Sequence, residues 1–292
     1  MIQYYKKDKE RGSGGEWILI ERLDKILAGT GRWSRREAGE LVRAGRVEAA
    51  GAVARRPEEK YEREGLDLRV DGEQVCGERY VYLMLHKPAG LLSATEDPRQ
   101  PTVLDLLPEH LRRVGLFPVG RLDKDTEGLL LLTNDGALAH DLLSPKKHVD
   151  KCYFAILDGP VGKAEQEAFA CGLDIGDEKR TLPAKLVPLP QGTAEPGQPQ
   201  KAESIVDARR PAQAESVADS PGFGVLITVQ EGRFHQIKRM AKAVGREVLY
   251  LKRLSMGSLR LDAALRPGEY RPLTEEEIES LKRSRKETAK EE

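Results

Sequence analysis

The sequence has few cysteines, few aromatic residues and no long apolar run. Its three cysteines, Cys76, Cys152 and Cys171, lie far apart and are odd in number, which favours reduced thiols over a disulfide framework. No apolar stretch approaches the roughly 20 residues of a membrane helix, and residues 1–16 are polar. We therefore expect a cytoplasmic chain with no membrane partner. The five histidines are scattered without the spacing of a metal site, so no metal ligand is predicted.

Neither sign of charge predominates, because 48 basic residues balance 48 acidic ones. At 292 residues the chain is long enough for two domains that each bury a core. Local charge differs from the average: residues 22–56 hold nine Lys or Arg against four acids, and residues 231–253 hold seven against two. Phosphate binding needs a basic face and not a basic average, so these two segments are candidates for contact with nucleic acid.

The most informative stretch is residues 120–136, which reads Gly-Arg-Leu-Asp-Lys-Asp-Thr-Glu-Gly, then four leucines, then Thr-Asn-Asp-Gly. Residues 129–133 are typical of a buried strand, since a short apolar run is bounded by turn residues. The acidic loop before this strand is fixed at the end of a rigid element, where a carboxylate can be both held and reached. Spacing alone is equally compatible with a solvated connection.

A calcium loop is a weaker interpretation of the same residues. Asp123, Asp125, Glu127 and Gly128 match positions 1, 3, 5 and 6 of the EF-hand pattern. Position 12 is Asn134, where a bidentate Glu is needed, and leucines occupy positions that should supply oxygen ligands. The pattern therefore does not favour calcium.

Residues 120–136 resemble the catalytic motif of the RsuA-type pseudouridine synthases, which isomerise uridine to pseudouridine in ribosomal RNA. In that family the Asp of Arg-Leu-Asp is catalytic, and it corresponds to Asp123. The resemblance also implies that Tyr153, in a Lys-x-Tyr strand, stacks on the flipped uracil. Lys238, in a Gly-x-x-His-Gln-x-Lys-Arg segment, is implied as the cation beside Asp123. Arg121 is expected to hold the phosphate of the flipped nucleotide or to fill the vacated stack.

Plainer alternatives remain open for these side chains. Tyr153 is also compatible with a core tyrosine, Lys238 with a phosphate contact, and Arg121 with a structural ion pair. The isomerisation requires neither redox chemistry nor hydrolysis, so no cofactor is implied. A fixed carboxylate can attack ribose C1′ or remove a ribose proton, and the resemblance leaves both possible. Unstacking the base costs a few kcal/mol, of which stacking on an aromatic ring offsets roughly 1–3 kcal/mol.

Residues 22–56 resemble an S4 RNA-binding domain. Leu23, Ile26 and Leu27 are spaced for one face of a short helix, and Ser34 with Glu37 forms a capping box for a second helix. Val47 and Val53, on either side of the Gly51 turn, predict a small hairpin. Its tip reads Ala-Ala-Gly at 49–51, where the family usually has Val-Asn-Gly, and a type I′ turn favours Asn before Gly. The expected RNA contacts are the basic residues Arg22, Lys25, Arg35, Arg36, Arg43 and Arg46, with Lys87, Arg121 and Arg239 from the remainder of the chain.

Together these features predict an α+β protein. We expect a flexible tail at 1–16, a small S4-like RNA-binding domain at 17–78 and a catalytic pseudouridine synthase domain at 79–283. The catalytic domain should have a mixed, mainly antiparallel sheet with flanking helices. Residues 190–221, rich in Pro, Gln, Ala, Ser and Glu, predict a disordered insertion, and 284–292 a charged tail.

The expected substrate is ribosomal RNA, free or within a ribosomal assembly particle, and the chain is expected to act as a monomer. Residues 143–149 and 267–273 look most like the small-subunit rRNA enzyme. A large-subunit enzyme and a catalytically silent, rRNA-binding assembly factor are the alternatives. A two-carboxylate glycoside hydrolase would need Asp125 or Glu127 as the partner acid of Asp123.

Overall fold

The computed structural model describes residues 3–6, 17–63, 65–75, 80–190 and 222–288. The chain forms two compact units. The first unit comprises Met1–Val81 with Leu107–Phe117, and the second comprises Tyr82–Leu106 with Pro118–Glu292. The first unit thus takes in a short segment that we expected in the catalytic domain. The predicted insertion lies outside the described residues, apart from Pro190.

The first unit contains two short helices packed together and two small sheets. Its core joins the apolar faces of both helices to the strands, with Leu23, Ile26 and Val42 fully buried. Its elements are β1 (Gln3–Lys6), β2 (Trp17–Arg22), α1 (Leu23–Ala28), α2 (Arg35–Arg43), β3 (Val47–Ala49), β4 (Ala52–Val53), β5 (Lys60–Glu62), β6 (Leu68–Val70), β7 (Glu73–Gln74) and α3 (Glu109–Arg113). The sheet orders are β1-β2-β5 and β4-β3-β6-β7. Strand β1 lies within the expected tail.

Both local predictions for this unit are confirmed. Ser34 Oγ accepts from the Glu37 amide at 3.2 Å, and Glu37 accepts from the Ser34 amide at 2.6 Å, so the capping box begins α2. Strands β3 and β4 form the expected hairpin, and Ala50 and Gly51 at its tip have φ of 51° and 80°. Ala50 therefore adopts the left-handed conformation that Asn adopts more readily.

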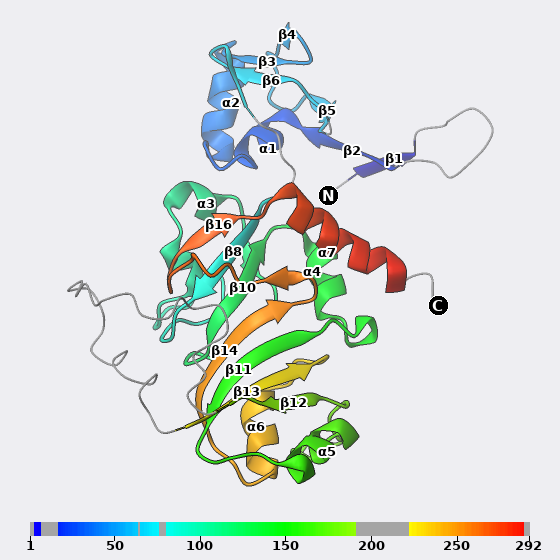
Figure 1. Cartoon of the computed structure of the whole chain (residues 1–292). Coiled ribbons are helices and arrows are strands. Elements are labelled where there is room, and N and C mark those ends of the chain that lie inside the picture. The colour runs from blue at the N-terminus through cyan, green and yellow to red at the C-terminus, as the bar shows by residue number, and fades with distance from the viewer. Residues whose placement is uncertain (1–2, 7–16, 64, 76–79, 191–221, 289–292) are drawn as a thin grey trace. The chain divides into compact units, whose positions relative to one another are not determined.

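The second unit is built on a nine-stranded sheet with the order β12-β13-β11-β14-β10-β8-β16, with β15 pairing with β14 and β9 with β10 (Figure 1). Of the pairs within it, β10 with β14 is parallel and the others with a given register are antiparallel. This confirms the mixed, mainly antiparallel sheet. The strands are β8 (Tyr82–Lys87), β9 (Phe117–Pro118), β10 (Glu127–Thr133), β11 (Lys151–Leu157), β12 (Lys185–Pro188), β13 (Phe223–Val229), β14 (Val248–Met256), β15 (Leu259–Arg260) and β16 (Tyr270–Pro272).

Strands β8 and β10 are covered on both faces. All six residues of β8 are buried, and residues 129–132 of β10 have no exposed surface. The apolar run after the acidic loop is therefore the buried strand that the sequence predicted. A strand buried on both faces holds the loop at its start in one position.

Helices flank the sheet and carry clear start signals. They are η1 (Val103–Leu106), α4 (Gly136–Leu143), η2 (Pro145–Lys147), α5 (Lys163–Cys171), α6 (Gln236–Ala243) and α7 (Glu275–Thr288). Asp135 caps α4 and accepts a 2.8 Å hydrogen bond from the Tyr82 hydroxyl, which ties this helix to β8. Thr274 and Glu277 form a second capping box, at the start of α7. Helix α7 continues to Thr288, into the expected charged tail.

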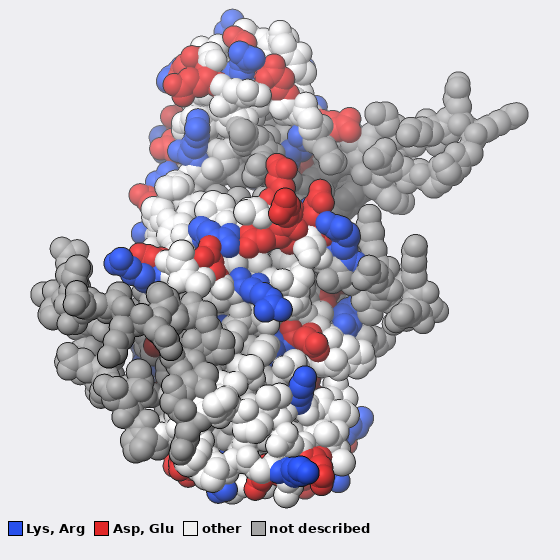
Figure 2. Space-filling model, viewed as in Figure 1, with Lys and Arg blue, Asp and Glu red and all other residues white. Residues whose placement is uncertain are grey.

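Acidic and basic side chains are interspersed over the face of the molecule shown in Figure 2. Cys152 and Cys171 are free thiols, half-buried and exposed respectively. Among the described helices, none is long and apolar enough to cross a membrane.

Candidate active site

Asp123 lies in the loop just before β10, with 26% of its side chain exposed. The carboxylate is thus neither sealed in the core nor fully in water. The hydroxyl of Ser93 donates to the carbonyl of Leu122 at 2.9 Å and accepts from its amide at 3.0 Å, which fixes the residue just before Asp123. A buried lysine also holds the backbone at Asp123, by a hydrogen bond to its carbonyl oxygen.

That lysine is Lys87, the last residue of β8, which has no exposed surface. Its Nζ donates to the carbonyl oxygens of Pro88, Asp123, Lys124 and Thr126 at 2.8–3.2 Å. Burial lowers the pKa of Lys87 to about 8, although the acids of the loop act in the opposite direction. A fully buried ammonium does not reach a phosphate. We therefore replace the RNA contact predicted for Lys87 by a role in holding the Asp123 loop.

Two side chains from the start of α6 reach the Asp123 carboxylate. Lys238 Nζ lies 3.5 Å from Oδ2, and His235 Nε2 lies 3.6 Å from Oδ1. The structure thus brings Lys238 to Asp123, as the sequence predicted. His235, which sequence reasoning left without an assigned role, joins them.

Lys238 makes its shorter contacts with Asp125, at 2.6 and 2.7 Å from the two carboxylate oxygens. Partial burial opposes ionisation of Asp125, but the hydrogen bonds and charge of Lys238 outweigh it and lower the pKa of that carboxyl. One ammonium is therefore shared between two carboxylates of the loop. The lysine joins α6 to the loop and compensates part of its negative charge.

Tyr153 lies on β11 and is 9% exposed. A row of paired residues crosses the sheet from Lys87 through Gly128 and Arg253 to Tyr153. Paired residues on adjacent strands face the same side of a sheet, so Tyr153 lies on the same face as Lys87. Tyr153 is two strands away from Gly128, which corresponds to a distance of about 10 Å. This places an aromatic ring on the side of the sheet that carries the Asp123 loop.

Gly128 allows the close strand approach in that row. Its φ is 102°, and an added Cβ would collide with the backbone carbonyl oxygen and amide nitrogen of Arg253. Only glycine fits this position without a backbone shift. The glycine that ends the acidic motif is therefore required by the parallel pairing of β10 with β14.

Arg239 does not extend toward a ligand. It donates to the carbonyl oxygens of Ile175 and Phe234 and pairs with Asp177. Arg233 donates to the carbonyl oxygens of Lys179 and Arg180. Both arginines fasten the turn before α6 to the segment 175–180. In this structure Arg239 therefore holds the turn before α6 against the segment 175–180, instead of making the predicted RNA contact.

Arg121 is exposed, and no ion pair joins it to another described residue. The predicted contacts of the first unit are also exposed, except Arg22, which is half-buried. Most of them pair with an acid of the same unit: Arg22 and Arg35 with Asp24, Lys25 with Glu21, Arg36 with Glu40, and Arg46 with Asp71. Arg36 and Arg46 pair with exposed acids, and such ion pairs contribute little stability, so these two side chains can exchange a carboxylate for a phosphate. Asp24 and Glu21 are buried, so the ion pairs of Arg22, Arg35 and Lys25 compensate buried charges. Their role as RNA contacts stays a prediction.

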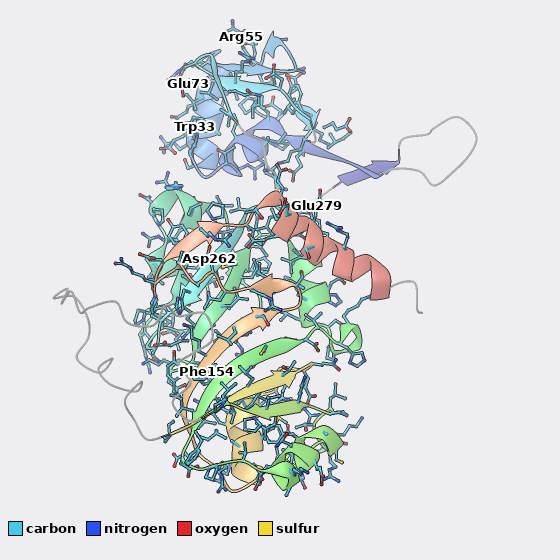
Figure 3. All side chains as sticks on the ribbon, viewed as in Figure 1. Trp33, Arg55, Glu73, Phe154, Asp262 and Glu279 are labelled. Carbon is cyan, nitrogen blue, oxygen red and sulfur yellow. The ribbon has the colours of Figure 1, made fainter. Side chains whose placement is uncertain are left out.

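The competing interpretations of the loop lose support. Asp125 is held by Lys238, and Glu127 accepts a 2.8 Å hydrogen bond from the Tyr250 hydroxyl, so neither presents a free acid for glycoside hydrolysis. Tyr250 itself packs edge-on against Phe154, which is labelled in Figure 3, at a centroid distance of 6.2 Å. No group of three or more His, Cys, Asp or Glu suited to a metal occurs among the residues that the structure describes.

Comparison with known proteins decides the family. Residues 81–243, which include the Asp123 loop, Tyr153 and Lys238, match the family described as RNA pseudouridylate synthase. The chain belongs to this family. As a pseudouridine synthase it is an enzyme of the isomerase class.

Relatives of this synthase match along almost their whole length. An uncharacterized RNA pseudouridine synthase of Bacillus subtilis, YtzG, is 46% identical over 260 residues, 89% of this chain and 98% of that protein. Ribosomal small subunit pseudouridine synthase A of Escherichia coli is 39% identical over 263 residues, 89% of this chain and 99% of the other. A crystal structure of a pseudouridylate synthase is similar with a TM-score of 0.55 at 33% identity, covering 89% and 99% of the two chains.

Sequence reasoning missed three features of the synthase site. It did not foresee that Asp125 holds Lys238, that Arg253 would be almost fully buried beside Gly128, or that Phe234 would be exposed next to His235. A signal existed for Arg253, since Lys252 and Arg253 interrupt an otherwise apolar strand. The other two depend on the turn before α6, whose left-handed residue His235 no spacing rule indicates.

Proposed function

We propose that this synthase converts a specific uridine of small-subunit ribosomal RNA to pseudouridine, with Asp123 as the catalytic carboxylate. The observation that carries the proposal is the half-buried carboxylate of Asp123, which Lys238 and His235 contact, on a loop whose backbone carbonyl oxygens accept from the buried Lys87. The 39% identity to an enzyme named for the small ribosomal subunit supports the choice of RNA.

The reaction needs three changes at one nucleoside. The bond from ribose C1′ to uracil N1 breaks, the base turns, and a bond from C5 to C1′ forms while C5 gives up its hydrogen as a proton and N1 takes up a proton. Asp123 either attacks C1′ or removes a ribose proton in the first step. Both roles require an ionised carboxylate, and the ammonium of Lys238 lies 3.5 Å from it.

Other side chains act on the flipped nucleotide. Tyr153 supplies the ring against which the uracil stacks, and this offsets part of the cost of unstacking it. Arg121, exposed two residues before Asp123, binds the phosphate of the same nucleotide. We propose that the first unit is an S4-like module whose exposed basic residues bind the RNA backbone, and that a monomer acts in the cytoplasm on RNA or an assembly particle.

Mapping of pseudouridines in rRNA tests this function. A strain that lacks the gene should lose one pseudouridine in its small-subunit rRNA. The unaltered gene should restore it, and the Asp123→Asn gene should not. Loss of a large-subunit site would establish the large-subunit enzyme instead, whereas an unchanged set of pseudouridines in both rRNAs would favour the binding-only assembly factor.

A further inference from the structure

Phe234 is the most exposed of the large apolar side chains in the described part of the chain. Its relative exposure is 71%, against 48% for Val53 and 47% for Leu249. A single exposed apolar residue is common and needs no explanation by itself. The surroundings of Phe234 are what set it apart.

The ring of Phe234 stacks on the ring of His235, with centroids 3.9 Å apart and planes 16° apart. The far edge of His235 lies at Asp123, with Nε2 3.6 Å from the carboxylate. One face of Phe234 is thus covered by imidazole, and its high exposure means that the other face is open. A second aromatic ring on that open face would extend the stack of Phe234 on His235, which starts beside the Asp123 carboxylate.

The backbone presents this pair of rings in a fixed way. His235 has a φ of 48°, a left-handed conformation that a residue other than glycine adopts only when the surrounding contacts hold it. Arg239 donates to the carbonyl of Phe234 and to that of Ile175, while Gln236 accepts from the Arg233 amide at 3.0 Å. The turn is therefore rigid, and little conformational entropy is lost when a ligand stacks on it.

We propose that the open face of Phe234 is a binding subsite for an unpaired nucleobase that neighbours the flipped uridine. Unpaired bases bind proteins by stacking on aromatic rings, and each base has a flat face that fits such a ring. The exposed Arg121 supplies positive charge for the connecting phosphates. The inference rests on the proposed function, because it takes the ligand of the site to be RNA.

The subsite is distinct from the position of the flipped uracil. The uracil lies against Asp123 and Tyr153, whereas the neighbouring base lies beyond His235, on the outer side of Phe234. Binding there fixes the strand next to the reacting nucleoside. It therefore contributes to RNA affinity and to site selection and leaves the chemical step unchanged.

Substitutions at Phe234 test the subsite by kinetics. The substrate is small-subunit rRNA from the deletion strain, labelled with tritium at uridine C5, and the measurement is tritium release. Phe234→Ala and Phe234→Leu should both raise KM about ten-fold with kcat nearly unchanged, and Phe234→Tyr should keep the original KM. Leu249→Ala, which removes an exposed apolar side chain from β14, should leave both constants unchanged. A Phe234→Leu protein with the original KM would show that apolar area suffices, and the proposal would be wrong.

Fluorescence supplies a readout that does not need turnover. Phe234→Trp, combined with Asp123→Asn and with Trp17 and Trp33 replaced by Phe, should lose indole emission when unlabelled small-subunit rRNA is added, since a stacked base quenches indole. Leu249→Trp in the same background should not. Binding of RNA without quenching at position 234 would overturn the subsite. If quenching occurs at position 234 but the protein with Asp123 intact forms no pseudouridine, the subsite is retained and the proposed function is rejected. Failure of the subsite and failure of the proposed function are therefore distinguishable.

Discussion

The ammonium of Lys238 lies between two carboxylates, 3.5 Å from Oδ2 of Asp123 and 2.6 Å from Oδ1 of Asp125. Asp125 is the more exposed of the two, with 70% of its side chain accessible against 26% for Asp123. The shorter ion pair, between Lys238 and Asp125, thus faces the solvent, whereas the longer one, between Lys238 and Asp123, faces the inner side of the loop. Asp125 thus keeps the lysine beside Asp123, the carboxylate that we propose as catalytic.

Lys238→Met should lower kcat on the order of 100-fold, because Asp123 then loses its nearest cation and gains an unbalanced repulsion from Asp125. Lys238→Arg should recover part of the rate, since the charge is retained. Asp125→Asn should have the smaller effect, because Lys238 can still pair with Asp123. Tritium release at saturating and at low rRNA concentration separates kcat from KM. An increase in KM alone for Lys238→Met would mark Lys238 as a phosphate contact.

Lys87→Met should impair catalysis without impairing RNA affinity. The substitution keeps much of the side-chain volume but removes the ammonium that donates to the loop carbonyl oxygens of Asp123 and Thr126, among others. A carboxylate that is no longer held in place loses rate, and we expect a fall in kcat of at least about ten-fold. Filter binding with unmodified rRNA gives the affinity. Weakened RNA binding with an unchanged kcat would instead return Lys87 to the role of an RNA contact.

Gly128→Ala should destabilise the second unit by at least about 2 kcal/mol, since the added Cβ meets the Arg253 backbone and the residue must hold a left-handed φ. Gly136→Ala is the matched control. Gly136 lies at the start of α4, its added Cβ meets nothing within 4 Å, and alanine favours the helix. Calorimetric unfolding should show a lower Tm for the first variant only. Equal Tm values would contradict the close approach of β10 to β14.

Glu277 should stabilise the second unit in a pH-dependent way. Arg271 donates to both oxygens of this carboxylate at 2.8 Å and to Asp262, which is labelled in Figure 3. The hydrogen bonds from Arg271 lower the pKa of Glu277 below its ordinary value of 4.5, against the effect of partial burial. Because the folded-state pKa is depressed, the stabilisation is complete above pH 4.5 and is lost as pH falls through the lower, folded-state value.

Glu277→Gln should therefore cost about 1 kcal/mol at pH 7 and progressively less as the pH is lowered below 4.5. Glu279→Gln, on the same helix and 71% exposed, should change stability little at any pH. Urea unfolding at a series of pH values gives both curves. A constant difference between Glu277→Gln and the unaltered protein down to the lowest pH would contradict the ion pair.

Much of the fold follows from local sequence signals. The capping boxes at Ser34 and Thr274 and the leucines of β10 each specify an element through contacts within a few residues. Periodicity and capping express those contacts directly, so the elements were predictable. The inclusion of Leu107–Phe117 in the first unit could not be predicted from the sequence, because it depends on packing between distant segments.

The site was predictable only in part for the same reason. Asp123 and Lys238 were assigned by resemblance, and the structure brings them together. For Lys87, the sequence shows a lysine at a strand end and cannot show that β10 covers it, so burial reversed its expected role. Arg239 was expected to face RNA because its helix is basic. Its true partners, Ile175 and Asp177, are more than 60 positions away.

The most direct measurement is tritium release by Asp123→Asn from rRNA labelled at uridine C5. This change removes one ionisable oxygen, keeps the size of the side chain and leaves intact the backbone contacts that hold the loop. We predict no release above background, together with unchanged affinity for the RNA and an unchanged Tm. Release at the rate of the unaltered protein would show that the Asp123 carboxylate is not the catalytic group.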